Sequence, residues 1–222
     1  MREGDVARWI LRGNTRDNLA LFSNFGVAYV LKVVNVPATT GYGEPVQSLL
    51  NFKDGERVVA AQLVTPTGEG ETPEAAQRWL VATARGMGFF CRPDVSETTK
   101  SGRRFARAKE GDEVLVVAPA AGDTITAATA AGKVLTFPAA ELAELAGVGR
   151  GVILMRVDKG DRLVGAVCHP LDQPPIAVAD DGSERRFHLP EVAHRAQKGR
   201  KALKRFKPAE LVERPAADET QS

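Results

Sequence analysis

The sequence predicts an all-β protein built as a propeller-like array of four-stranded blades, and two observations carry this prediction. The first is composition: the 222 residues include 21 glycines and 13 prolines but only 6% aromatic side chains, which favours many short strands joined by tight turns. The second is an internal repeat of about 45 residues that occurs four times. One such unit cannot bury both faces of its sheet, so neighbouring units must pack side by side.

Recurring glycines align the four repeats. A first glycine follows a short apolar run, a second follows 16 or 17 residues later, and a third precedes the last apolar run. The first and second glycines are Gly26 and Gly43, Gly86 and Gly102, Gly132 and Gly149, and Gly182 and Gly199. The third are Gly55, Gly111 and Gly160, with Pro208 in the fourth repeat. The repeats therefore cover residues 17–64, 78–120, 123–170 and 174–213.

Each repeat is predicted to contribute four short strands. Two apolar runs on either side of the first glycine form a β-hairpin, as "LALF" and "VAYVLKV" do in the first repeat. Glycine suits these turns because they often require a positive φ, which a side chain resists. A third strand such as "VILMRV" follows the second glycine, and a fourth such as "RLVGAV" follows the third.

The ends of the chain differ from the repeats. Residues 1–16 include "REGDVARWIL", which has the third-glycine step and final strand of a repeat, so we expect the end of a truncated preceding repeat there. The β domain then covers residues 1–214, and residues 215–222 are expected to form an acidic disordered tail. Residues 65–77 are interpreted as a surface loop. Trp9 and Trp79 are expected in strands, within the core.

The residues predict no catalytic group, metal site or cofactor in this chain. Cys91 and Cys168 lack the partners of a disulfide framework or a zinc site, and the three histidines are scattered. The repeated Gly-Asp steps are better explained by turns than by calcium loops, which need more carboxylates. No apolar stretch approaches the roughly 18 residues of a membrane-spanning helix, so we expect a cytoplasmic, nucleoid-associated protein with no membrane partner.

The segment "EGDVARWILRGNTRDNLALFSNFGVAYVLKVVNVP" resembles the C-terminal repeats of the A subunits of bacterial type IIA topoisomerases. The similarity continues through "GYGEPVQSLLNFKDGERVVAAQL", "LVATARGMGFF" and "GKVLTFPAAELAELAGVGRGVILMRVDKGDRLVGAV", and extends from Glu3 to about Val212. "GYGEPV" and "LTFP…EL…GRGV" are closer to the topoisomerase IV member of this family than to the DNA gyrase member, and both parentages stay open.

The resemblance implies a β-pinwheel, in which neighbouring blades exchange strands in a disc or open crescent whose outer rim binds and bends DNA. The implied partners are double-stranded DNA, the ATPase B subunit, and the N-terminal breakage-reunion part of the A subunit. The chain itself would be catalytically silent within an ATP-hydrolysing holoenzyme. The gyrase box Gln-Arg-Arg-Gly-Gly-Lys-Gly is absent, through truncation or degeneration, and "AQKGRK" at 196–201 is the nearest approach.

Cations recur at matching places in the repeats, although the net charge is only +2. Each phosphate that a cation neutralises releases counterions, so a DNA-binding rim needs cations at intervals. If the repeats share a fold, the second-glycine loops and third strands of repeats two to four form one positive stripe. The predicted DNA-binding residues are Lys100, Arg103, Arg104, Arg107, Arg150, Arg156, Arg185, Arg186, Arg195, Lys198, Arg200, Lys201, Lys204 and Arg205.

Nothing in the sequence indicates a recognition helix, so the predicted function is non-sequence-specific DNA binding with bending or wrapping. The alternative is a β-propeller scaffold that binds proteins and not DNA. In that case the loop cations would not share one edge of the array.

Overall fold

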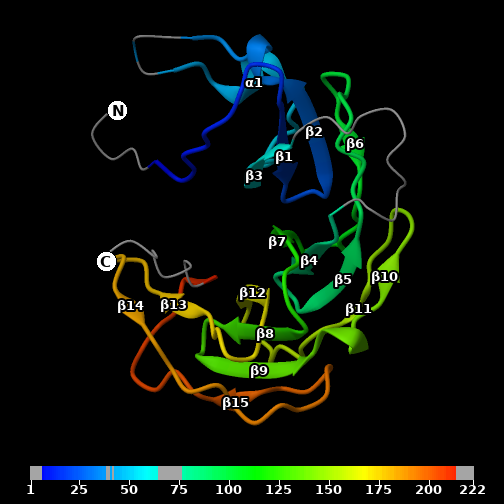
Figure 1. Ribbon diagram of the computed structural model, residues 1–222. Coiled ribbons are helices and arrows are strands. Elements are labelled where there is room, and N and C mark those ends of the chain that lie inside the picture. The colour runs from blue at the N-terminus through cyan, green and yellow to red at the C-terminus, as the bar shows by residue number, and fades with distance from the viewer. Residues whose placement is uncertain (1–6, 39–40, 42, 65–76, 214–222) are drawn as a thin grey trace, which may run out of the picture.

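The computed structural model describes residues 7–38, 41, 43–64 and 77–213, which form four small sheets that follow one another along an arc (Figure 1). The strand order across the first sheet is β3 (Val58–Val64), β1 (Asn18–Ser23), β2 (Val27–Lys32) and β6 (Arg103–Arg104). The order across the second sheet is β10 (Glu144–Leu145), β5 (Met87–Cys91), β4 (Trp79–Thr83) and β7 (Val114–Pro119), and β11 (Val152–Ile153) also pairs with β5.

The other two sheets are β12 (Leu163–His169), β8 (Thr124–Thr129), β9 (Lys133–Pro138) and β15 (Arg200–Lys201), then β14 (Glu184–Arg185), β13 (Ile176–Val178) and β16 (Glu210–Val212). Three short helices complete the described elements: η1 (Val33–Asn35), α1 (Val46–Leu49) and η2 (Ala139–Glu141). None of the helices in the described part of the chain has the length and apolar character that crossing a bilayer needs. The all-β, propeller-like prediction is confirmed.

Neighbouring repeats exchange strands. The second repeat supplies β6 to the first sheet, the third repeat supplies β10 and β11 to the second, and the fourth repeat supplies β15 to the third. A blade is therefore not one repeat: its hairpin and inner strand come from one repeat and its outer strand from the next. The third strand that we expected within each repeat's own sheet belongs to the preceding blade, as the pinwheel resemblance implied.

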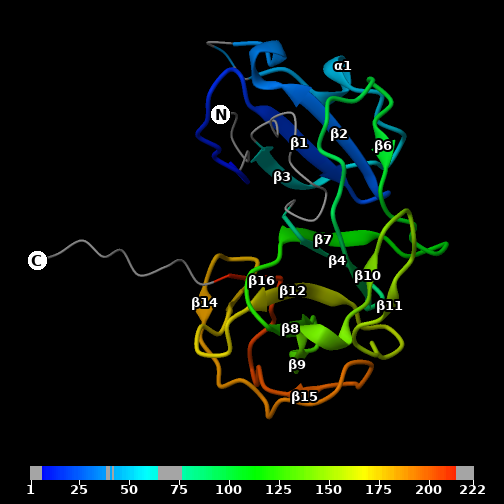
Figure 2. The ribbon, with the colours of Figure 1, turned by 45° about the vertical axis from the view of Figure 1, so that its right-hand side comes forward.

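The strands β3, β7, β12 and β16 form the inner edge of the arc, where each contacts the next (Figures 1 and 2). The core lies between the sheets, because alternate residues of one strand face opposite neighbours. Trp79 and Val81 of β4 pack with the first blade, and Leu80 and Ala82 pack with the third. This is why β4 is buried along its whole length and is apolar from Trp79 to Ala82.

A glycine carbonyl joins each repeat to the next. In the second blade, the carbonyl oxygen of Gly86 accepts the N–H groups of both Leu154 and Met155, at 2.8 and 3.1 Å. Gly86 has φ of +81°, and a Cβ there would lie 2.1 Å from the carbonyl oxygen of Met155. The same pair of bonds links Gly26 to Phe105 and Ala106, and Gly132 to Ala202 and Leu203.

The glycine register that we predicted for the third repeat is wrong. Gly151, with φ of +71°, stands directly before β11, as Gly102 (+67°) and Gly199 (+70°) stand before β6 and β15. Gly149 was expected in that role, because it kept the spacing of 17. In the third repeat this glycine comes two residues later than the expected spacing of 17, and the short strand β10 lies in the interval.

The predicted strand near the N-terminus is also not observed. Residues 7–14 have no assigned strand, and Trp9 is 39% exposed, whereas Trp79 is buried as expected. A final strand needs the rest of its blade as a pairing partner, and the described sheets supply none beside these residues. The expectations for residues 1–6, the loop at 65–76 and the tail at 215–222 lie outside the described residues.

The Gly-Asp steps at Gly111-Asp112 and Gly160-Asp161 form turns, as predicted, and the third step, Gly4-Asp5, lies outside the described residues. One carboxylate oxygen of Asp112 accepts the N–H groups of Arg85 and Glu113, at 2.9 and 2.8 Å. Asp161 does the same with Ala131 and Arg162, at 3.0 and 2.9 Å. Each aspartate ties the turn before an inner strand to the hairpin turn of its own repeat. Among the described residues, no cluster of His, Cys, Asp or Glu has the form of a metal site.

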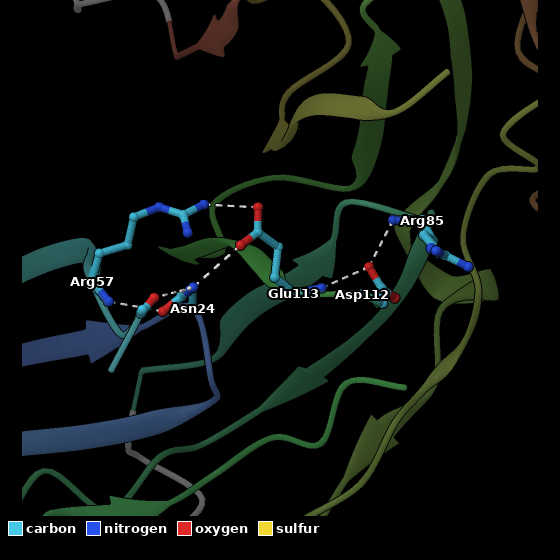
Figure 3. Close-up of polar contacts among 6 residues, drawn as sticks. Asn24, Arg57, Arg85, Asp112 and Glu113 are labelled. Carbon is cyan, nitrogen blue, oxygen red and sulfur yellow. Dashed lines mark hydrogen bonds and ion pairs between the residues drawn. The ribbon is translucent and has the colours of Figure 1, made fainter. Parts of the chain in front are cut away.

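A polar clamp joins the first two blades at the start of β7 (Figure 3). The Glu113 carboxylate accepts hydrogen bonds from Arg57 Nη2 at 2.7 Å and from Asn24 Nδ2 at 3.2 Å. Asn24 and Arg57 also exchange two bonds, from Asn24 N–H to the Arg57 carbonyl and from Arg57 N–H to Asn24 Oδ1. The hydrogen bond from Arg57 holds the pKa of Glu113 below its usual value, and the same bond raises the pKa of Arg57.

We expect Gly86→Ala to destabilise the protein more than Gly160→Ala. Gly160 has a matching φ of +82° but no heavy atom within 4 Å of an added Cβ. Gly160→Ala should therefore lower the free energy of unfolding only by the backbone strain, about 1–2 kcal/mol. Gly86→Ala adds a clash with the next repeat, about 1–3 kcal/mol more. Urea denaturation measures both. Equal losses of unfolding free energy in the two variants would show that the contact between Gly86 and the next repeat does not require glycine for its close approach.

We expect Glu113→Gln to lower the free energy of unfolding at pH 7 by about 0.5–1 kcal/mol, because the partner Arg57 is half exposed and screened. Because the pKa of Glu113 is lower in the folded protein than its unfolded value of about 4.3, the ionised carboxylate stabilises the fold above that pH. This stability is lost as the pH falls through the folded-state pKa. The difference between variant and parent should therefore shrink below about pH 4. Glu110→Gln, an exposed acid in the same turn, is the control, and a pH-independent difference would contradict the clamp.

Candidate nucleic-acid interface

The outer strands place four of the predicted DNA-binding residues at equivalent positions. Arg103 and Arg104 of β6 lie opposite Ala28 and Val27, and Arg200 and Lys201 of β15 lie opposite Val134 and Lys133. These strands are on the outside of the arc in the first and third blades (Figure 1). The second blade has Val152 and Ile153 at this position instead. The cation row along the outer strands is therefore interrupted in the second blade.

A second row is regular across three repeats. Arg107, Arg156 and Lys204 each stand five residues after the glycine that directly precedes the outer strand. The N–H of Arg107 bonds to the carbonyl oxygen of Gly149 at 2.9 Å, and the N–H of Arg156 bonds to that of Gln197 at 2.8 Å. Those acceptors directly precede Arg150 and Lys198. Each of these two third-strand cations thus lies beside the loop cation of the following repeat, which joins positions far apart in the sequence.

Acidic residues form ion pairs with some of these cations. Asp158 bonds to Lys133 and also to Lys198, at 2.8 Å. The hydrogen bonds from these two lysines lower the pKa of Asp158 to about 2. Arg103 pairs with Asp94 at 2.5 Å. Arg200 lies 3.9 Å from Glu191.

Three other predicted cations bond to main-chain oxygens. Arg104 Nη1 donates to the carbonyl of Phe25 at 3.0 Å, and Arg195 Nη1 donates to that of Ile153 at 3.0 Å. Lys201 donates to the carbonyl of Ala131. These bonds fix the direction of long side chains, and Arg195 is half-buried, whereas the other thirteen predicted residues are exposed. Glu141 also binds the N–H of Arg195, and this bond lowers the pKa of Glu141.

The fourth blade gathers cations around a pocket of about 370 Å³. Arg185 lies over the ring of Phe206, 5.4 Å from its centroid. The pocket is lined by Arg185, Arg186, Phe187, His188, Ala202, Leu203 and Lys204.

The side chains of seven predicted cations make no hydrogen bond, ion pair or ring contact with the residues that the structure describes. They are Lys100, Arg107, Arg150, Arg156, Arg186, Lys204 and Arg205. These seven are the most available to an external anion.

Two cations near this surface were not among the predicted residues. Lys133 lies across from Lys201 in the register of β9 and β15, and its place directly after the first glycine of its repeat could have indicated it. Arg92 pairs with Glu144 at 2.9 Å and lines a pocket of about 220 Å³ between the first two blades, together with Arg103 and Arg104. The sequence gives no signal for Arg92, because strand exchange alone brings Glu144 beside it.

The fold and the exchanged strands define a β-pinwheel domain. Residues 17–65 and 123–170 match the family model described as the DNA gyrase C-terminal domain, beta-propeller. The structure is similar to the C-terminal domain of DNA topoisomerase IV, with a TM-score of 0.73, 20% identity, and coverage of 90% of this chain and 63% of the other. It is also similar to the Escherichia coli ParC C-terminal domain, with a TM-score of 0.71, 21% identity, and coverage of 93% and 84%.

Curated sequences agree with these matches. The DNA gyrase A protein of Aminobacterium colombiense is 27% identical over 204 residues, which is 90% of this chain and 24% of that protein. The chain is thus similar, in sequence and in fold, to the C-terminal domains of the A subunits of DNA gyrase and topoisomerase IV, in agreement with the resemblance seen in the sequence. It spans about a quarter of the length of the curated relatives that it matches.

We expect Asp158→Asn to increase the affinity of this surface for polyanions. The change removes one negative charge and releases Lys133 and Lys198 from their shared partner. The variant should therefore elute from a heparin column at higher salt than the parent protein. Asp180→Asn, an exposed acid outside the cation rows, controls for net charge alone. Equal elution of the two variants would contradict a role for Asp158 in holding these lysines.

Proposed function

We propose that this domain binds double-stranded DNA without sequence specificity along its outer rim and bends or wraps it, as part of a type IIA topoisomerase that controls DNA topology. The observation that carries the proposal is the row Arg107, Arg156 and Lys204. These residues come from three repeats, occupy equivalent positions and have no side-chain partner among the described residues. Cations that recur at structural intervals suit the regular spacing of phosphates.

The shape of the array supports bending. Outer strands of successive blades lie along a curved edge (Figure 2), so a duplex that follows the cations must curve with it. Bending 20–30 base pairs by 40–90° costs on the order of 1–6 kcal/mol, which several phosphate contacts can offset.

The proposed partners follow from this role. Besides DNA, they are the ATPase B subunit, and the N-terminal breakage-reunion part of the A subunit, while the proposed location is the cytoplasmic nucleoid. The related proteins are named as A subunits of gyrase and topoisomerase IV, which supports such an assembly. The chemistry of strand passage would belong to those other parts, since the role proposed for this domain is only the handling of DNA.

We expect the triple variant Arg107→Ala, Arg156→Ala and Lys204→Ala to bind duplex DNA more weakly and with a shallower salt dependence. Losing three phosphate contacts should reduce the slope of log K against log salt concentration by about 2–3. A fluorescence anisotropy titration of a random-sequence duplex at several salt concentrations measures this slope.

The matched control is Lys53→Ala, Lys109→Ala and Lys159→Ala, which removes three exposed cations from the turns before the inner strands. This control should keep the parent slope. Equal loss in both variants would indicate dependence on net charge and not on the rim. Absence of salt-dependent binding by the parent protein would favour the protein-binding scaffold.

A further inference from the structure

The outer strand of the second blade differs at one position from the outer strands of the first and third blades. The residue that stands two places after the glycine before each outer strand is Arg104 in β6, Ile153 in β11 and Lys201 in β15. All three residues are exposed, and the exposed fraction of Ile153 is 40%. Equivalent positions of three successive blades therefore carry a cation, an aliphatic side chain and a cation.

The main chain is the same at these three positions. The glycine two residues before each of them has φ between +67° and +71°. In each repeat the next two residues donate their N–H groups to the carbonyl oxygen of the first glycine of the preceding repeat. The change at Ile153 is thus a change of side chain within a preserved backbone, and the three side chains start from equivalent places on the rim.

The two cations make matching contacts that an aliphatic side chain cannot make. Arg104 donates to the carbonyl oxygen of Phe25, and Lys201 donates to that of Ala131. Each acceptor directly precedes the first glycine of its blade. A guanidinium has five N–H donors and an ammonium has three, so both side chains keep donors for phosphate oxygens after this contact. Ile153 offers neither kind of bond.

Cations lie beside Ile153 although its own side chain is apolar. Arg195 Nη1 donates to the carbonyl oxygen of Ile153 at 3.0 Å. Arg150 and Arg156 stand three residues before and after it, and their side chains have no hydrogen bond or ion pair within the part of the chain that the structure describes. An aliphatic side chain in such a place suits a polyanion that has apolar surface between its charges. In duplex DNA, the sugars and base edges inside a groove form such a surface between two phosphate strands.

We propose that a groove of the bound duplex, and not a phosphate strand, faces the outer strand of the middle blade, where Ile153 packs against deoxyribose and base edges. The inference rests on the proposed function, because it assigns a part of the duplex to each blade of the rim. Arg104 and Lys201 then bind phosphates on either side of this groove. A duplex wrapped on a protein turns a groove inward at regular intervals. An uncharged side chain can approach the groove without losing the hydration of an ion.

The experiment compares two polyanions, a random-sequence DNA duplex and inorganic polyphosphate, each labelled at one end and titrated with the full chain in fluorescence anisotropy. Polyphosphate has repeated phosphate charges but neither deoxyribose nor grooves. Ile153→Ala should bind the duplex about 3- to 10-fold more weakly at every salt concentration, with an unchanged salt slope, because only an apolar contact is lost. It should bind polyphosphate like the parent protein.

Two further variants serve as comparisons. Arg104→Ala should bind both polyanions more weakly and reduce the salt slope for the duplex by about 1, because it removes a phosphate contact. Leu171→Ala removes an exposed aliphatic side chain that lies outside the outer strands, and it should bind both polyanions like the parent. Unchanged circular dichroism and unchanged polyphosphate binding would show that Ile153→Ala keeps its fold and its rim.

Two results would overturn the inference and leave the proposed function in place. In the first, Ile153→Ala binds the duplex as tightly as the parent protein does. In the second, it weakens binding of the duplex and of polyphosphate to the same extent. A parent protein that does not bind the duplex at all would overturn the proposed function, and this inference with it.

Discussion

The structure depends on one main-chain contact, in which the carbonyl oxygen of a hairpin glycine accepts two consecutive N–H groups from the next repeat. This contact recurs at Gly26, Gly86 and Gly132. It requires a positive φ and the absence of a side chain. Any residue other than glycine would therefore be strained at this position. Because each contact crosses from one repeat to the next, no blade is complete without its neighbour. The array is therefore held together by backbone geometry as well as by the apolar layers between its sheets.

The same contact arranges the charged surface. The residue that follows the two N–H groups bonded to the preceding glycine is exposed in each of the three repeats. That residue is Arg107, Arg156 or Lys204, and the N–H groups of Arg107 and Arg156 then bond to the loop of the following repeat. These three cations are thus positioned by main-chain bonds, and they recur once in each repeat. Acids such as Asp158 hold some of the lysines and reduce the charge that an external anion meets.

Much of the fold could be predicted from local sequence. The hairpins, the inner strands and the turn role of Asp112 and Asp161 follow from apolar runs and turn residues, whose conformations are set by near neighbours. The register of the third repeat could not be predicted by spacing, because two additional residues, in an interval that contains β10, precede Gly151. The environment of Trp9 could not be predicted either, since a strand is stable only where a partner edge exists.

The sequence by itself determined that the chain is a repeated all-β array with cations at matching places, because strand, turn and charge patterns are local properties of the chain. Only the tertiary structure decided which blade each outer strand completes, and hence which cations lie together. The physical reason is that a main-chain hydrogen bond carries no side-chain signature, so the choice between pairing within a repeat and across repeats is made by the geometry of the whole array. Arg92 shows this directly, since its acidic partner Glu144 belongs to the next repeat.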